Sequence, residues 1–535
     1  MSESQRQVPL ADLLNALPGF ERVEVPDTTV TGIALDSRRV QPGDLFVALA
    51  GGNTDGHRYI PAAIGKGAAA VVGMQPRLEL DVPYLQVGDS RQALAYLSAA
   101  FYGFPARRLT VIGVTGTDGK TTTSTLIYQI LSAAGKKVGM ISTVNAFIGE
   151  DVLDTGFHVT TPEAPDLQRY LAQMVERGLT HVVLEATSHG LEQQRVLACD
   201  FDLGVVTNIT HEHLDYHGSY EAYRAAKARL FTSLAETPSK PQGNLRLAVL
   251  NRDDASYDYL SSLIQSLNTT HISQLQAPIP VISYGLHPES TLRAEGIAYD
   301  PSGLRFTAAG RDFRLPIESR LSGEFNVSNC LAAVAATVIG LGVEARAAEN
   351  GILALQSIPG RMERIDLGQD FMAIVDFAHT PNALQRALRT ARQMTSGRVI
   401  AVFGSAGLRD RAKRRMMADA SVEMADLTIL TAEDPRTESL EDILSEMADG
   451  ARAQGGVEGE AFYRIPDRGK AIRFALSQAN PGDLVIALGK GHEQSMCFGE
   501  VEVPWDDRTA MRAALAERLG VPGPEMPPLP TAPRE

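Results

Sequence analysis

Short apolar runs alternate with longer amphipathic segments along the middle of the chain. The runs are rich in β-branched residues and bounded by glycine or polar residues, which predicts buried strands at 109–114, 180–186, 201–207 and 245–250. Helices are predicted after residue 120 and over 219–231, where apolar residues recur every three or four positions. This alternation predicts βαβ units around a mainly parallel sheet.

The same pattern continues on both sides of this central region. Residues 1–105 carry strand-like runs broken by turns, and the segment IPAAIGKGAAAVVG predicts a helix and then a strand. A second doubly wound pattern follows residue 356, with strands predicted at 371–376, 398–404, 426–431 and 483–488. A length of 535 residues is too great for one core. We therefore expect an α/β protein with domains at 1–105, 106–355 and 356–522, and a disordered Pro-rich tail at 523–535.

Composition and charge narrow the function classes. The formal net charge is -14, whereas a nucleic-acid binder needs a basic face, so small molecules are the expected partners. Cys199, Cys330 and Cys497 are far apart and odd in number, which favours reduced thiols, and we expect them in the core. The N-terminus lacks a signal-peptide pattern, and no apolar run reaches the length of a membrane span. These features predict a cytoplasmic protein without a membrane segment.

The segment LTVIGVTGTDGKTTTST, at 109–125, predicts a strand, a phosphate-binding loop and a helix. Gly116 and Gly119 allow the backbone amides to turn inward. Lys120 can reach the β and γ phosphates, and the hydroxyl of Thr121 can bind Mg2+. Val114 stands where the general pattern G-x-x-x-x-G-K-[ST] has its first glycine. A glycine-rich hairpin turn with a solvated lysine is the alternative, but the strand before the loop and the threonine run after it favour nucleotide binding.

Other polar residues follow the predicted strands, at the edge where parallel sheets bind ligands. Glu185 ends a buried strand and is placed to meet the Mg2+ of a bound nucleotide, although an ordinary strand-end acid is the alternative. The histidines of HEHLDYHG (211–218) alternate in a way that suits zinc, but one histidine on Mg2+ fits the neighbouring phosphate loop better.

Three further segments hold weaker candidates. Lys227, on the predicted helix 219–231, would by itself pass for a surface lysine. Asn326 and Asn329 are predicted to cap a helix, and Asn326 is a candidate for hydrogen-bonding a base. The turn Asp36-Ser37-Arg38 offers a hydroxyl and a guanidinium for a phosphate, with a plain turn and a solvated arginine as the alternative.

Taken together, these motifs resemble those of the Mur ligase family over nearly the whole chain. In the family's order they are Asp36-Ser37-Arg38, GVTGTDGKTTT, His158 to Pro162, EATSHGLEQQR, NITHEHLDYHG, the helix with Lys227, GEFNVSN, IPGRMER, DFAHTPNAL, DPRTE and GKGHE. The resemblance implies a three-domain architecture with a central P-loop-type, mostly parallel sheet and a Rossmann-like C-terminal domain. The domains would bind, in order, the UDP part of the substrate, ATP and the incoming amino acid.

The resemblance also implies roles for individual residues. The catalytic residues would be Lys120, Glu185, His213 and Lys227. The Mg2+ ligands would be Thr121, Glu185, His213 and Lys227, the last carbamylated so that it resembles a carboxylate. ATP would contact Thr115, Gly116, Thr117, Asp118, Gly119, Lys120, Thr121, Thr122, Asn326, Arg361 and Asp376. The UDP-sugar dipeptide would contact Ser37, Thr160, Thr161, Thr187, Gln193 and Arg195, and the amino acid Arg409, Asp434, Pro435, Arg436, Gly489 and Glu493.

The implied reaction is ATP-dependent amide-bond formation in peptidoglycan precursor synthesis. UDP-N-acetylmuramoyl-L-alanyl-D-glutamate would be activated as an acyl phosphate and then attacked by the amine of a diamino acid. Arg409 and Arg436 suit the extra carboxylate of meso-diaminopimelate. Asp434 replaces the Asn of the family's Asp-Asn-Pro-Arg pattern, which leaves L-lysine and L-ornithine as alternatives. Asp118 also replaces an Asn, and we expect it to point away from the phosphates or to reach the adjacent backbone. A monomer is expected.

Two rival functions stay open on the sequence. A folylpolyglutamate synthase shares the ATP-binding core and the acyl phosphate chemistry, but it lacks an N-terminal UDP domain and the Asp-Pro-Arg motif. A non-catalytic relative would bind nucleotide or wall precursor as a regulator. The joint presence of Lys120, Glu185, His213 and Lys227 argues against that relative, because loss of catalysis would relax all four.

Overall fold

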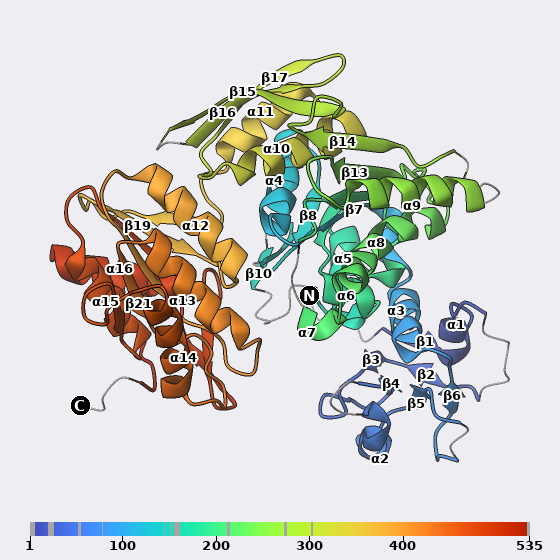
Figure 1. Cartoon of the computed structure of the whole chain (residues 1–535). Coiled ribbons are helices and arrows are strands. Elements are labelled where there is room, and N and C mark those ends of the chain that lie inside the picture. Colours follow the sequence, from blue (N-terminus) through green and yellow to red (C-terminus); the bar gives the residue numbers. More distant parts are fainter. Residues whose placement is uncertain are drawn as a thin grey trace. The chain divides into compact units, whose positions relative to one another are not determined.

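The computed structural model describes residues 6–19, 26–51, 55–76, 79–143, 145–149, 151–154, 161–210, 214–271, 275, 277–300 and 303–531. The chain divides into two compact units, one of residues 1–293 with 329–348 and the other of residues 294–328 with 349–535 (Figure 1).

The first unit begins with a small parallel sheet in the order β3-β4-β5-β6. Its strands are β3 (Gly32–Ala34), β4 (Asp44–Val47), β5 (Ala70–Gly73) and β6 (Tyr84–Gln86), and β1 (Val8–Pro9) pairs separately with β2 (Thr29–Val30). Helices α1 (Leu10–Leu14) and α3 (Ser90–Phe101) pack against one face of β4 and β5, and α2 (Ile60–Gly65) packs against the other. A small α/β layer, as expected from the sequence, therefore opens the chain.

The large sheet has the order β10-β9-β8-β11-β7-β12-β13-β14-β15-β16-β17. Its strands are β7 (Thr110–Thr115), β8 (Val138–Ile141), β9 (Asn145–Ile148), β10 (Asp151–Asp154), β11 (His181–Glu185), β12 (Leu203–Val206), β13 (Leu247–Asn251), β14 (Val281–Gly285), β15 (Leu292–Asp300), β16 (Gly303–Ala309) and β17 (Arg314–Ser319). Seven neighbouring strands pair in parallel, in the order β8-β11-β7-β12-β13-β14-β15, which confirms the predicted parallel core. The hairpins β9–β10 and β16–β17 are antiparallel, and the βαβ alternation does not predict them. The boundary between the two units falls within β15.

Helices cover the parallel strands. They are α4 (Lys120–Ala133), α5 (Ala164–Glu176), α6 (Ser188–Glu192), α7 (Leu214–His217), α8 (Tyr220–Glu236), α9 (Tyr257–Thr270), α10 (Phe325–Val334) and α11 (Ala345–Ala354). On one face α5, α8 and α9 bury leucines against Val111, Leu184 and Leu250 of the sheet. Register pairs Glu185 of β11 with Val114 and Val206 of β12 with Thr115, so these three strands end together at one edge.

The second unit contains a sheet in the order β18-β19-β23-β20-β21-β22. Its strands are β18 (Glu363–Ile365), β19 (Met372–Asp376), β20 (Val399–Phe403), β21 (Leu427–Leu430), β22 (Phe462–Arg464) and β23 (Leu484–Leu488), and β24 (Ser495–Phe498) forms a separate hairpin with β25 (Val501–Pro504). Helices α12 (Pro381–Met394), α13 (Ala412–Met424) and α14 (Leu440–Ala453) cover one face, and α15 (Arg468–Gln478) and α16 (Asp507–Leu519) cover the other (Figure 1). Because β23 lies between β19 and β20, the strand order reverses there, and ligands bind at the carboxyl edge of such reversals.

The expectation of a disordered tail is wrong for residues 523–531. Leu529 is buried in the core under α15 and α16, and Met526 packs against that core. The hydroxyl of Thr531 donates to Oδ2 of Asp467 over 2.9 Å, beside the start of α15. Proline removes backbone donors and stiffens a chain, but apolar residues between the prolines can still anchor it.

Two smaller expectations also need correction. Cys199 and Cys330 are buried free thiols as expected, but Cys497 is only half-buried, on β24. Asn326 and Asn329 do not cap α10, because both lie inside that helix. The side chain of Asn329 faces Gly119 of the phosphate loop and accepts the hydroxyl of Thr123, on α4, over 3.3 Å. Within the described residues, no helix is long and apolar enough to cross a membrane.

Candidate active site

The phosphate loop runs from Thr115 at the end of β7 to Gly119 at the start of α4. Both of its glycines are required by space, because a Cβ at Gly116 would lie 1.8 Å from the hydroxyl of Thr207 and one at Gly119 would lie 2.3 Å from Oδ1 of Asn329. Both also have positive φ, of 151° and 80°. The predicted strand, loop and helix are therefore confirmed.

The backbone of the loop is held by the residues that follow β12. The amide of Thr117 donates to the carbonyl of Asn208 over 2.7 Å, and the amide of Asp118 donates to its Oδ1 over 3.0 Å. The hydroxyl of Thr207 donates to the carbonyl of Asp118 over 2.6 Å. Asn208 thus holds the loop through both its backbone and its side chain, a role that was not predicted from the sequence.

The first turn of α4 carries the charged and hydroxyl groups of the loop. Nζ of Lys120 donates to the carbonyl of Thr117 over 2.9 Å, so the lysine folds back across the loop. Thr121 and Thr122 are buried, and the hydroxyl of Thr115 is buried without a hydrogen-bond partner among the described residues. Backbone amides, a lysine and a helix N-terminus make a site for phosphates.

Glu185 is the acid nearest to this turn. Its carboxylate is 3% exposed and accepts the hydroxyl of Thr121 at 3.0 and 3.2 Å. Thr143, after β8, donates its amide to the same carboxylate over 3.1 Å and its hydroxyl over 3.0 Å. Thr143 was missed from the sequence, because a threonine after a strand carries no signal of its own. Glu185 and Thr121, each predicted at this edge of the sheet, therefore lie in contact.

Lys227 is 1% exposed and is not a surface lysine. It lies on α8, and its Nζ donates to the carbonyl of Gly116 over 2.6 Å and lies 4.6 Å from the ring centre of Tyr223. The hydroxyl of Tyr223 lies 3.0 Å from that of Thr117, so α8 contacts the loop through both residues. The remaining predicted metal ligand, His213, falls outside the described residues, as does His211.

A second group of predicted residues gathers beside Glu185, at the start of α6. The hydroxyls of Thr161 and Thr187 lie 3.0 Å apart, and that of Thr161 donates to the carbonyl of Glu185 over 3.1 Å. Arg195 donates to Oε1 of Gln193 and to the carbonyl of Thr161, and it pairs with Glu163. Thr160 lies outside the described residues.

The turn with Ser37 follows β3. Ser37 is buried, while the guanidinium of Arg38 is turned back onto Asp36 with contacts of 2.8 to 3.1 Å. This hydrogen bond is the largest influence on the carboxyl of Asp36 and lowers its pKa. Arg38 is thus occupied within the turn, which corresponds to the plainer of the two sequence interpretations.

In the second unit, Asp376 ends β19 and is buried. Its carboxylate accepts the amides of Met362 at 2.7 Å and Ala378 at 2.9 Å. Burial raises the pKa of Asp376, and the nearby Arg361 opposes that rise. The guanidinium of Arg361 lies 4.4 Å from the ring centre of Phe377, so these groups form one cluster. Asn326 is buried in the first turn of α10 and donates to the carbonyl of Ser322 over 2.7 Å.

The predicted amino-acid residues lie at the carboxyl edge of the same sheet. Lys490 is fully buried and donates to Oδ1 of Asp434 over 3.0 Å and to Oε2 of Glu493 over 2.5 Å. Burial acts to lower the pKa of Lys490, but Glu493 and Asp434 outweigh it and raise the pKa. Gly489 approaches Glu433 so closely that a Cβ would lie 2.3 Å from Oε2 of that acid. Lys490 stands within the GKGHE motif and Glu433 directly precedes DPRTE, but neither was predicted as a site residue.

Arg409 and Arg436 lie on two neighbouring loops of this edge. Arg409 is exposed, and Arg436 is half-buried beside the buried Pro435. The backbone of Arg436 pairs with β24, since its amide donates to the carbonyl of Cys497 over 3.0 Å and its carbonyl accepts the amide of Gly499 over 2.8 Å. The backbone of Arg436 is thus anchored to β24.

Family models match three consecutive parts of this chain. The Mur ligase family, catalytic domain model matches residues 29–102, the Mur ligase middle domain model matches 114–337, and the Mur ligase, glutamate ligase domain model matches 360–491. The chain belongs to the Mur ligase family.

Individual relatives agree with the family. A UDP-N-acetylmuramyl-tripeptide synthetase of Roseiflexus sp. (strain RS-1) is 44% identical over 92% of this chain and 96% of its own length. A UDP-N-acetylmuramoyl-L-alanyl-D-glutamate--2,6-diaminopimelate ligase of Geobacillus thermodenitrificans (strain NG80-2) is 41% identical over 95% of this chain and 99% of its own length. A solved structure of a ligase with the latter name has a TM-score of 0.65 at 31% identity, covering 96% of this chain and 100% of that chain. The protein is therefore an ATP-dependent ligase that forms amide bonds.

Proposed function

We propose that this protein joins the D-glutamate carboxylate of UDP-N-acetylmuramoyl-L-alanyl-D-glutamate to an amine of meso-diaminopimelate in peptidoglycan precursor synthesis. The observation that carries the proposal is the grouping of Glu185, Thr121 and Lys227 around a phosphate loop, in a chain whose relatives bear that activity in their names. We assign the parts of the reaction to three domains, 1–105, 106–355 and 356–522.

The chain's own residues position the reactants. The loop amides and Lys120 hold the phosphates of ATP, so that the substrate carboxylate attacks the γ-phosphorus and ADP leaves. The amine then attacks the carbonyl carbon of the acyl phosphate, and the tetrahedral intermediate loses phosphate as the amide forms. Thr161, Thr187, Gln193 and Arg195, with Ser37 and Thr160, hold the UDP-sugar dipeptide, and Asn326, Arg361 and Asp376 contact ATP.

The donors beside the loop fit Mg2+. A carboxylate and a hydroxyl at a helix N-terminus are oxygen ligands, and Mg2+ takes few protein ligands when it also binds phosphates. Thr121, Glu185 and His213 would hold it. When bound, it would neutralise charge shared among the phosphoryl oxygens.

Lys227 would serve as a ligand only after carbamylation, in which its neutral amine adds to CO2 and releases a proton. A buried amine beside the Gly116 carbonyl and the Tyr223 ring is placed for this, because its position faces the loop and not solvent. Lys227→Ala should lower kcat on the order of 100-fold. Acetate or formate should restore part of the activity of the variant and none to the wild type. A fully active Lys227→Ala would remove the ligand role.

We favour meso-diaminopimelate over L-lysine and L-ornithine on electrostatic grounds. Its far end carries a carboxylate, which the guanidiniums of Arg409 and Arg436 can pair. Asp434, the residue that left lysine open, is already paired with Lys490 inside the protein. A non-catalytic relative and a folylpolyglutamate synthase-like ligase are the alternatives, and the latter lacks the Asp-Pro-Arg motif that contains Arg436.

The deciding experiment is phosphate release with ATP, Mg2+ and UDP-N-acetylmuramoyl-L-alanyl-D-glutamate. Meso-diaminopimelate, L-lysine and L-ornithine are offered in separate reactions. Release that depends on meso-diaminopimelate supports the proposal, whereas release that depends on lysine or ornithine corrects the amino acid. Release with none of them would favour the non-catalytic relative.

A further inference from the structure

The loops that carry Arg409 and Arg436 contact each other. Arg409 belongs to the loop after β20, and Arg436 belongs to the loop after β21. The amide of Gly407 donates to the carbonyl of Asp434 over 2.9 Å, and a Cβ at Gly407 would lie 2.0 Å from the carbonyl oxygen of Pro435. The loops therefore touch backbone to backbone just before each arginine.

Leu408, the residue before Arg409, has a left-handed backbone with φ of 55°. A leucine rarely adopts this conformation unless its surroundings impose it. Its amide donates to Oε1 of Glu438 over 2.9 Å. Glu438 lies on the other loop, so its carboxylate holds the backbone from which Arg409 projects.

The second oxygen of Glu438 is held by Arg414, on α13. The guanidinium of Arg414 donates to Oε2 of Glu438 over 2.5 Å and to Oε2 of Glu446, on α14, over 3.0 Å. The side chain of Arg414 is 1% exposed, while that of Glu438 is 27% exposed. The Leu408 amide and Arg414 hold the pKa of Glu438 below its usual value, so the bridge is ionised at neutral pH.

We propose that Arg414 and Glu438 are a pair of positioning residues that sets the aim of Arg409 relative to Arg436, and so the preference for an amino acid with a carboxylate at its far end. Neither side chain touches the substrate. The pair acts by keeping Leu408 left-handed, and a fixed separation of two guanidiniums suits a carboxylate better than two independent ones. This inference rests on the proposed use of meso-diaminopimelate.

The test measures KM for meso-diaminopimelate, KM for ATP and kcat in Glu438→Gln, Arg414→Lys and Arg414→Met. Glu438→Gln keeps an oxygen for the Leu408 amide but loses the charge that binds Arg414. We expect its KM for meso-diaminopimelate to rise about tenfold and its preference over L-lysine to fall about tenfold, with KM for ATP unchanged, as for one charge-assisted contact. Arg414→Lys should recover part of what Arg414→Met loses.

Arg411→Met is the matched control. Arg411 lies beside α13 and pairs with the same Glu446, but its side chain is 69% exposed and does not reach Glu438 in any contact that the structure describes. Its kinetics should stay within about twofold of the wild type. If Arg414→Met does not fold, Glu438→Gln decides alone.

Two results would overturn the inference. One is an equal rise of KM for meso-diaminopimelate and KM for ATP in Glu438→Gln, which would mean that the pair only maintains the structure. The other is an unchanged preference over lysine. A failure of the proposed function would look different, since the wild type itself would then show no release dependent on meso-diaminopimelate.

Discussion

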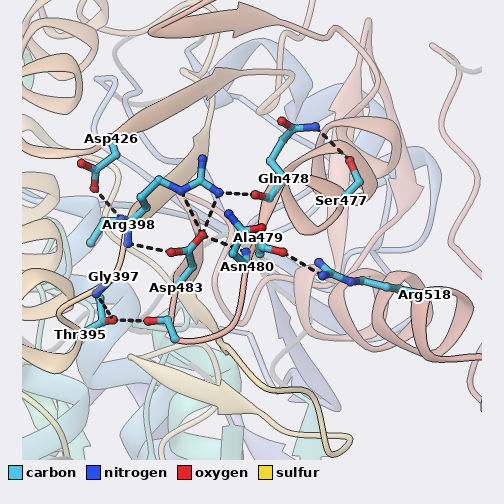
Figure 2. A network of polar contacts seen from close by, with 12 residues as sticks. Thr395, Gly397, Arg398, Asp426, Ser477, Gln478, Ala479, Asn480, Asp483 and Arg518 are labelled. Atoms are coloured by element: carbon cyan, nitrogen blue, oxygen red, sulfur yellow. Dashed lines mark hydrogen bonds and ion pairs between the residues drawn. The ribbon is translucent and has the colours of Figure 1, made fainter.

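The two edges of the C-terminal sheet are built from similar residues but differ in how completely their polar groups are paired. At the amino edge, Arg398, Asp426 and Asp483 precede β20, β21 and β23, and their network is closed (Figure 2). Asp483 accepts the amide of Arg398 at 2.8 Å, its guanidinium at 2.8 and 3.1 Å, and the amide of Asn480 at 2.9 Å. Each oxygen of this carboxylate has donors.

At the carboxyl edge, buried polar atoms are left over. Oε2 of Glu433, Oγ of Ser405, Nδ1 of His492 and Nε of Arg361 are buried, and none has a hydrogen-bond partner within the described part of the chain. Burial raises the pKa of Glu433 to about 6 and lowers that of His492 well below its usual value. Buried polar groups are ordinarily paired, so unpaired ones gathered at one edge mark a place that accepts ligands.

Stability and recognition are thus divided between the two edges of the sheet. Hydrogen bonds to backbone carbonyls at the amino edge hold the ends of α12, α15 and α16 (Figure 2). The carboxyl edge keeps buried polar atoms that have no hydrogen-bond partner among the described residues. Changes at the carboxyl edge should therefore alter kinetics at little cost in stability, and changes at the amino edge should do the reverse.

The largest expected effect is that of Arg436→Ala, at the carboxyl edge. Loss of a guanidinium that pairs with a substrate carboxylate should lower kcat/KM for meso-diaminopimelate by two to three orders of magnitude, or about 3 to 4 kcal/mol. The thermal midpoint should not change. Arg452→Ala, which removes a half-exposed guanidinium paired on the surface, is the control. Equal losses with meso-diaminopimelate and with lysine would contradict the assignment.

The second effect is that of Asp483→Asn, at the amino edge. The change removes the charge that Arg398 pairs with, and should lower the free energy of unfolding by about 2 kcal/mol at neutral pH. The pKa of Asp483 is lowered in the folded protein, since hydrogen bonds from Asn480 and Arg398 outweigh burial. Its contribution is therefore present above the unfolded pKa and is lost as the pH falls, so the two proteins should converge in acid.

Denaturant unfolding at several pH values measures this difference. Asp366→Asn, in an exposed pair with Arg364, is the control and should change little. A raised KM for either substrate in Asp483→Asn, with stability intact, would break the division between the edges.

The sequence predicted four strands of each sheet and the phosphate loop that follows β7, and the reason is local. A phosphate loop and a strand-end acid such as Glu185 are recognised from residues that are consecutive in the sequence, so a local pattern predicts them. No local pattern predicts the roles of Thr143, Arg414 and Glu438, because each acts through a contact with a residue 30 or more positions away. The order of residues 523–531 was not predicted, because a Pro-rich composition indicates disorder and gives no sign that Leu529 is buried.

A third prediction concerns Glu433, whose pKa is raised from 4.5 to about 6 by burial. A raised pKa means that its contribution to stability is fully present below pH 4.5 and is lost as the pH rises through about 6. Glu433→Gln cannot ionise, so its stability relative to the wild type should improve by about 2 kcal/mol between these limits. Glu460→Gln, at an exposed acid, is the control and should show no such trend.

The smallest expected effect is that of Asp434→Asn. Oδ1 of Asp434 accepts Nζ of Lys490 at 3.0 Å and the amide of Cys497 at 2.9 Å, and an asparagine oxygen can accept both. The left-handed φ of 40° at this position also suits asparagine. The ratio of kcat/KM for meso-diaminopimelate to that for L-lysine should therefore change by less than about threefold, or about 0.6 kcal/mol.

The competing interpretation of Asp434 gives a different result in the same assay. If this carboxylate read the distal ammonium of lysine, its neutralisation would remove a charge-assisted contact and lower lysine use by about tenfold or more. An unchanged ratio would instead mean that Asp434 serves as an internal partner of Lys490, as Asp483 serves Arg398 at the amino edge. The carboxyl edge would then discriminate between amino acids through Arg409 and Arg436, because Asp434 is already paired with the buried Lys490.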